Sequence, residues 1–160
     1  MVGASFPDLF RHQAWADSAL LATVHAHPQS LADDTVLKAL RHILRVQRVF
    51  LARFHGGSGD EVRELPPEFG TMVALWRTTH QEQIAFVEGL AEADFARTFP
   101  MPALAIHPTF AEGLTQVILH SQNHRGQCLT RLRENGAAPP RLDYILWIKD
   151  RPAPSYPEIG

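Results

Sequence analysis

The chain has 160 residues, of which 45% are hydrophobic and 20% charged, and its formal net charge is -2. This length fits one domain, residues 1–160, that can bury a hydrophobic core without disulfide support. Lys and Arg are not in excess, which argues against a protein that binds nucleic acid. The single Cys128 cannot form an internal disulfide, and the sequence has neither a signal-peptide pattern nor an apolar run long enough for a membrane span. We therefore expect a cytoplasmic protein with no membrane partner.

Hydrophobic periodicity predicts two helices in the first third of the chain. The first covers about residues 6–25. It is expected to end before Pro28, because the residue before a proline is disfavoured in helical geometry. Asp33 or Asp34 offers an N-cap for the second helix, residues 34–54, whose apolar residues fall on one broad face.

The rest of the chain predicts two further long helices and a short one. The third helix covers about residues 67–90 and the fourth about residues 110–134. Between them, the three prolines of residues 95–109 exclude a continuous helix and favour an extended crossover with a short strand pair. A short amphipathic helix is predicted over residues 142–148, and the proline-rich tail, residues 151–160, is expected to pack loosely. Four long helices with one long connection predict an all-α four-helix bundle.

Histidine is unusually frequent, with nine residues. His120 and His124 lie four residues apart on the fourth helix, so both side chains share one face about one turn apart. Helical metal sites use this spacing because two imidazoles can reach one ion without distorting the backbone. The same spacing also occurs on solvated helix faces. His42, at the edge of the apolar face of the second helix, is the third candidate ligand, although spacing alone does not show that it meets the other two.

Several neighbouring residues have a functional and a structural interpretation. Gln127, two turns after His120, either hydrogen-bonds to a metal ligand or is a surface glutamine. Cys128 is interpreted as a small buried apolar residue more readily than as a ligand. His12, on the first helix, is a candidate for the mouth of a pocket.

Other polar residues near these positions receive structural interpretations. Gly126 in mid-helix predicts the close approach of another helix, because glycine there costs about 1 kcal/mol relative to alanine. Arg125 is expected to form an ion pair or to lie on a dimer surface, and Asp17 and Glu112 are expected on solvated faces. The remaining histidines are assigned to helix ends, the surface or loops: His25, His27, His55, His80 and His107.

The segment HSQNHRGQCLTRLRENGAAPPRLDYILW, residues 120–147, resembles the C-terminal signature of the DinB/YfiT-like superfamily. The matching positions are His120, His124, Arg125, Gly126, Gln127, Leu132, Arg133, Gly136, Pro140, Asp143 and Tyr144. The segments LKALRHILRVQRVFLARF and LFRHQAWADSALLATV are similar to the family's histidine-bearing helix and opening helix, so the resemblance covers nearly the whole chain.

This resemblance implies a four-helix bundle with up-down-down-up connectivity, a long crossover before the fourth helix and a short C-terminal helix, often as a homodimer. It also implies one divalent metal ion (nickel, zinc, manganese or iron) on His42, His120 and His124. Characterised relatives include transferases that use mycothiol, bacillithiol or glutathione, and metal-dependent hydrolases.

We therefore expect a metal-dependent enzyme that acts on a small-molecule substrate, by activating either a low-molecular-weight thiol for S-transfer or a water for hydrolysis. The alternative is a non-enzymatic, stress-associated bundle that binds a metal or a small ligand. A third hypothesis is a helical scaffold whose histidines have no shared role.

Overall fold

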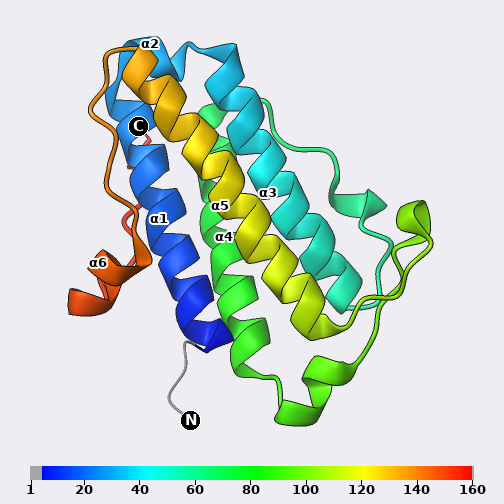
Figure 1. Cartoon of the computed structure of the whole chain (residues 1–160). Helices are drawn as coiled ribbons and strands as arrows, with labels where there is room; N and C mark the ends of the chain where they lie inside the picture. Colours follow the sequence, from blue (N-terminus) through cyan, green and yellow to red (C-terminus); the bar gives the residue numbers. More distant parts are fainter. Residues whose placement is uncertain (1–4, 160) are drawn as a thin grey trace.

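The computed structural model describes residues 5–159, which are helical and contain no β-strand. The helices are α1 (Phe6–Ala26), α2 (Pro28–Leu31), α3 (Asp34–Phe54), α4 (Phe69–Glu88), α5 (Phe110–Glu134) and α6 (Tyr144–Asp150). The four long helices α1, α3, α4 and α5 pack as a bundle (Figure 1). The predicted long helices are confirmed to within two residues at each end, whereas the single turn of α2 was not predicted. None of the helices within residues 5–159 has the length and apolar character needed to cross a membrane.

Local sequence signals account for the helix ends. Asp33 caps α3, since its side chain accepts hydrogen bonds from the backbone N–H groups of Thr35 and Val36 at 2.8 and 3.5 Å. The N-terminus of α5 is a capping box in which Thr109 and Glu112 each accept a hydrogen bond from the other's backbone N–H. These caps fix where the two helices that carry the candidate ligands begin.

The colour gradient in Figure 1 gives the direction of each helix. Helices α1 and α5 run toward one end of the bundle, and α3 and α4 run toward the other. The chain therefore crosses the length of the bundle between α3 and α4, through the 3₁₀ turn η1 (Asp60–Val62). The connection between α4 and α5 is long but stays at one end of the bundle (Figure 1).

This α4–α5 connection holds no regular strand pair. It contains the 3₁₀ turns η2 (Glu92–Ala96) and η3 (Pro102–Leu104) and two isolated bridges, Thr98 with Thr109 and Met101 with Ile106. The predicted strand pair is thus reduced to single bridges. Arg53 of α3 donates a hydrogen bond to the carbonyl of Pro100 at 2.9 Å, which ties the loop to the bundle.

The core is divided along the bundle axis into two apolar clusters. One cluster contains Leu20, Leu40, Trp76, Cys128 and Leu132, and the other contains Phe10, Phe50, Phe54, Val87, Phe110 and Leu114. On each long helix a buried polar residue lies near the change from one cluster to the other: Asp17 on α1, Gln47 on α3, His80 on α4, and Ser121 and Arg125 on α5. A polar layer therefore separates the two halves of the core.

The C-terminal tail is ordered against the bundle. Ser155 donates its backbone N–H to the Ser18 hydroxyl at 3.0 Å, and the Tyr156 hydroxyl hydrogen-bonds with His80 at 2.6 Å. Most described residues of the tail are exposed, as a loosely packed tail predicts, but these two hydrogen bonds anchor it to α1 and α4.

Candidate metal centre

Three histidines from two helices meet at the seam between α3 and α5. The Nε2 atoms of His42 and His120 lie 3.0 Å apart, and one ligand atom from each of His42, His120 and His124 lies within 4.8 Å of the other two. In a tetrahedral zinc site, Zn–N bonds of about 2.0–2.1 Å separate the nitrogens by about 3.3 Å. The donor set therefore fits a divalent ion after small side-chain rotations.

The helix register explains why these side chains point at one another. His120 and His124 are one turn apart on α5 and half-buried, and each is followed directly by a buried residue of the polar layer, Ser121 and Arg125. Because Ser121 and Arg125 face the interior, the two histidines are turned toward the seam with α3. His42 faces them from α3, five residues before Gln47 of the same polar layer.

Gln127 engages one of the three histidines. Its Oε1 lies 2.7 Å from Nδ1 of His124. An amide oxygen can only accept, so Nδ1 donates and the lone pair of the neutral ring lies on Nε2. Gln127 is exposed, so it is a surface glutamine that also hydrogen-bonds with His124. Such an outer partner fixes the tautomer and orientation that a metal ligand needs.

The electrostatics of the cluster favour neutral imidazoles. Burial, followed by the neighbouring His124 and His42, lowers the pKa of His120 to about 4. The pKa of His42 is also lowered, first by burial, then by His124 and Arg45. Both rings are thus neutral near pH 7, which is the form that coordinates metal ions.

Behind the triad, Asp17 is the centre of the buried polar layer. Its side chain is 1% exposed, and its carboxylate accepts hydrogen bonds from Arg125 at 2.8 Å and Gln47 at 2.9 Å. Gln47 also donates to the Ser121 hydroxyl at 3.1 Å. The guanidinium of Arg125 and the hydrogen bonds to the carboxylate outweigh its burial and lower the pKa of Asp17. The ion pair predicted for Arg125 is present, whereas the solvated position predicted for Asp17 was wrong.

His80 belongs to the same layer. Its Nε2 lies 3.0 Å from the Asp17 carboxylate, and its side chain is 2% exposed. The surface position predicted for His80 was therefore wrong. One sequence signal could have found this layer: each of the four long helices has a polar residue within its apolar stripe, at a similar level along the bundle.

Two other candidates lie outside the site. His12 hydrogen-bonds with the carbonyl of Leu142 at 2.8 Å and packs against Trp147, so it holds the C-terminal segment instead of reaching a pocket near the triad. Cys128 is 1% exposed and belongs to an apolar cluster, and burial raises the pKa of its thiol to about 12. It behaves as the buried apolar residue that its sequence position predicts.

The two glycines of α5 have opposite environments. A Cβ at Gly126 would meet no heavy atom of the described chain within 4 Å, so the close helix approach predicted there was wrong. A Cβ at Gly113 would lie 2.7 Å from Phe99 and 2.8 Å from Phe54. Close packing therefore requires glycine at position 113, where the α4–α5 loop meets α3 and α5.

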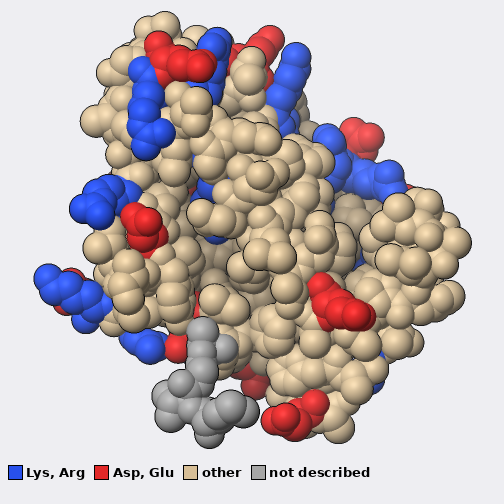
Figure 2. All heavy atoms as spheres, in the orientation of Figure 1, with Lys and Arg blue, Asp and Glu red and all other residues tan. Residues whose placement is uncertain are grey.

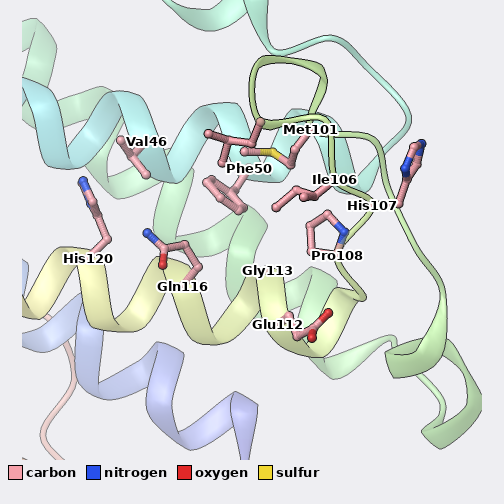
Figure 3. Close-up of a pocket in the computed structure, with 11 residues that line it drawn as sticks. Val46, Phe50, Met101, Ile106, His107, Pro108, Glu112, Gly113, Gln116 and His120 are labelled. Carbon is pink, nitrogen blue, oxygen red and sulfur yellow. The ribbon is translucent and has the colours of Figure 1, made fainter.

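A cavity of about 710 Å³ opens beside the triad, with His120 in its wall. Figure 3 shows the side chains of His120 and Gln116 pointing from α5 toward α3, followed along the cavity by Phe50, Met101, Ile106 and Pro108. Glu112, which was expected to be solvated, is exposed at the rim, where it caps α5. His120 is thus accessible from a largely apolar space.

Residues 9–128 match the family model described as DinB superfamily. No curated protein and no solved structure gives a significant match.

Proposed function

Because the chain belongs to the DinB superfamily, we propose that it is a metal-dependent enzyme that holds one divalent ion on His42, His120 and His124. The observation that carries this proposal is the convergence of three imidazoles next to a cavity that a small molecule can enter. Nickel, zinc, manganese and iron all accept imidazole ligands.

The donor set suits catalysis. Three neutral imidazoles leave the full positive charge on an ion, which then supplies Lewis acidity that favours hydroxide or thiolate near neutral pH. The described residues offer no fourth His, Cys or carboxylate ligand in this cluster. One coordination position is therefore left for a substrate, as in catalytic sites with three protein ligands.

The residues around the triad have supporting roles in this proposal. Gln127 holds the tautomer of His124, and the buried Arg125 and Ser121 hold the rotation of α5. The reaction is either S-transfer from a low-molecular-weight thiol or hydrolysis by water. The reaction products distinguish them: an S-substituted thiol formed when electrophiles are screened with the thiol supports S-transfer, and turnover without any thiol supports hydrolysis.

The alternative is a non-enzymatic bundle in which the ion ties α3 to α5. This role is supported by the position of the triad, which bridges the two helices and would stabilise the folded state by mass action. Water exchange at the bound ion separates the two functions. A displaceable water agrees with an enzyme, and a saturated coordination shell agrees with a structural ion.

A homodimer belongs to the proposal as well, because two-fold dimers are the commonest oligomers. The outer face of α5 carries Leu119, which is 62% exposed, and the open Gly126. Light scattering of the wild type beside Leu119→Arg tests whether this face pairs with a second copy. A dimeric wild type and a monomeric variant would support the pairing, and a monomeric wild type would exclude it.

The metal proposal is tested by elemental analysis of untagged protein. We expect about one equivalent of metal in the wild type and its loss in both His42→Ala and His120→Ala. His55→Ala, at an exposed histidine, is the matched control and should keep the metal. Equal metal content in all four proteins, or none in any after loading, would contradict the proposal.

A further inference from the structure

The cavity beside His120 has the size of a small-molecule site and is built from three segments. Its volume of about 710 Å³ lies within the range of about 300–1,000 Å³ that is common for ligand pockets. Helix α3 supplies one wall, α5 the second, and the loop between α4 and α5 the third (Figure 3). The apolar lining residues are Val46, Phe50, Met101, Leu104, Ile106, Pro108 and Gly113.

Backbone hydrogen bonds hold the loop wall in place. Met101 donates its backbone N–H to the carbonyl of Ile106 at 2.9 Å, and Phe99 donates to Pro108 at 3.1 Å. Leu104 and Ile106 are nevertheless 63% and 48% exposed. Apolar side chains on a hydrogen-bonded loop beside a hollow form an apolar wall that a ligand can cover without a large rearrangement.

The polar groups of the cavity are placed unevenly. Gln116 lies one turn before His120, and both point toward α3 at the same end of the cavity (Figure 3). His107 lies at the opposite end, and the Glu112 carboxylate is engaged by Thr109 in the capping box. Two side chains that can hydrogen-bond to a ligand therefore lie together beside the triad, and His107 lies apart from them.

Charge separates this cavity from the other side of His42. No Lys or Arg lines the cavity. Arg45 and Arg63 instead line a smaller hollow of about 280 Å³ that includes His42. In Figure 2 the middle of the visible face carries few charged side chains, and Lys and Arg gather toward its upper and left edges. Away from an ion on the triad, an anionic group would find no cation in the larger cavity, and burying it there would be costly.

We propose that this cavity binds the uncharged, apolar body of a small-molecule substrate, with the reacting polar end of that substrate at His120. The Gln116 amide hydrogen-bonds to the polar end, and Phe50, Met101 and Ile106 contact the body. This inference rests on the proposed function in one respect only, namely that an ion on the triad acts on the polar end.

Alkyl hydroxamates test the proposal, because their head group binds metal ions and their chain length can be varied. For zinc-loaded protein, we expect octanohydroxamate to bind at least about tenfold more tightly than acetohydroxamate, since each buried methylene favours binding. An eight-carbon hydroxamate that carries a carboxylate at the far end of its chain should lose this gain in affinity. Ile106→Asp should abolish the gain, whereas Ile145→Asp, at a 69% exposed residue of α6, should retain it.

The outcomes separate the cavity from the metal. Binding of acetohydroxamate with no gain from the longer chain would overturn the cavity proposal and leave the metal site intact. If neither hydroxamate binds zinc-loaded protein, the open metal position fails, and 1-octanol with metal-free protein then decides the cavity. Amide chemical-shift changes at Gly113 and Gln116 with 1-octanol, absent in Ile106→Asp, would support the cavity, and unchanged shifts would overturn it. A third outcome concerns the oligomeric state. If Ile106→Asp converts a dimer to a monomer, and the wild type gains no affinity from the longer chain, the apolar wall belongs to an interface with a second copy. This result would also overturn the proposal.

Discussion

The Nε2 atoms of His42 and His120 lie 3.0 Å apart although 78 residues separate them in the chain. Only one proton can lie between two nitrogens at this distance, so at least one ring must be neutral and accept. An unmetallated pair of this kind is destabilised when both rings become protonated. The same approach of two lone-pair donors is what a metal ion requires.

The stability of metal-free protein should fall in mild acid. The pKa of His120 in the folded state is about 4, against 6.5 for the ordinary side chain. Between these values the unfolded chain binds more protons, so the contribution of His120 is fully present above pH 6.5 and is lost as the pH falls toward 4. Urea unfolding with a chelator at pH 7 and pH 5 measures this loss.

His120→Gln should reduce this pH dependence, because glutamine does not titrate. His107→Gln, at an exposed histidine, is the control and should leave the pH dependence unchanged. The same slope in all three proteins would mean that His120 titrates normally.

The α3 cap should be a measurable source of stability. Asp33 accepts hydrogen bonds from Asn135 and Arg131 of the α5 end as well as from the first turn of α3. Asp33→Ala should therefore lower the free energy of unfolding by about 1–2 kcal/mol. Asp34→Ala, at the exposed neighbouring carboxylate, should cost only a few tenths of that amount. Equal losses would show that the cap is not specific to Asp33.

Acid should remove the same cap. The hydrogen bond from Asn135, followed by that from Arg131, lowers the pKa of Asp33 from 3.8 to about 2. A carboxylate with a depressed folded-state pKa stabilises the protein above its unfolded value, and this stabilisation is lost as the pH falls from about 4 to about 2. The difference in stability between wild type and Asp33→Ala should shrink over this range.

The two glycines of α5 should respond in opposite directions to alanine. At Gly113 the new methyl would lie 2.7 Å from Phe99, and overpacking of this kind typically costs about 1–3 kcal/mol. At Gly126 the methyl meets open space within the chain, and alanine should stabilise the helix by up to about 1 kcal/mol. Thermal unfolding of both variants measures the contrast. A destabilising Gly126→Ala would indicate that a second copy covers this position.

Cys128 should be inert in the native protein. Its burial raises the pKa of the thiol to about 12, so the reactive thiolate is scarce near neutral pH. We expect no alkylation by iodoacetamide at pH 7 until the chain is unfolded in guanidinium chloride. Cys128→Ser should also retain full metal content. Rapid native alkylation or loss of metal would place this thiol in the site.

The buried pair of Asp17 and Arg125 should be strongly coupled. Arg125→Met leaves the carboxylate buried without its cation, which typically costs about 3–5 kcal/mol. Replacing both residues, with Asp17→Leu added, should cost clearly less than the sum of the single changes. Urea unfolding of the three variants closes the cycle, and additive losses would contradict coupling through this ion pair.

Local sequence patterns determined most of the helical structure. The four long helices follow from signals that act within a few residues of the chain. These signals are apolar residues at helical spacing, the cap at Asp33, the capping box at Thr109 and the proline at position 28. The spacing of His120 and His124 likewise placed both on one face of α5, and the resemblance of the C-terminal motif to a known family added His42. The helices and the spacing of His120 and His124 depend on local geometry, which a single chain segment contains, whereas His42 depended on the resemblance.

Only the tertiary structure decided which polar groups face one another. Asp17 and His80 looked like solvated residues because a polar side chain within an apolar stripe does not reveal its partners, and those partners lie 30 or more residues away along the chain. The cavity wall depends on an irregular loop whose path is set by bridges and by its contact with Arg53. Periodicity indicates which face of a helix is buried. Tertiary packing decides which other helix covers that face, and therefore which polar side chains meet there.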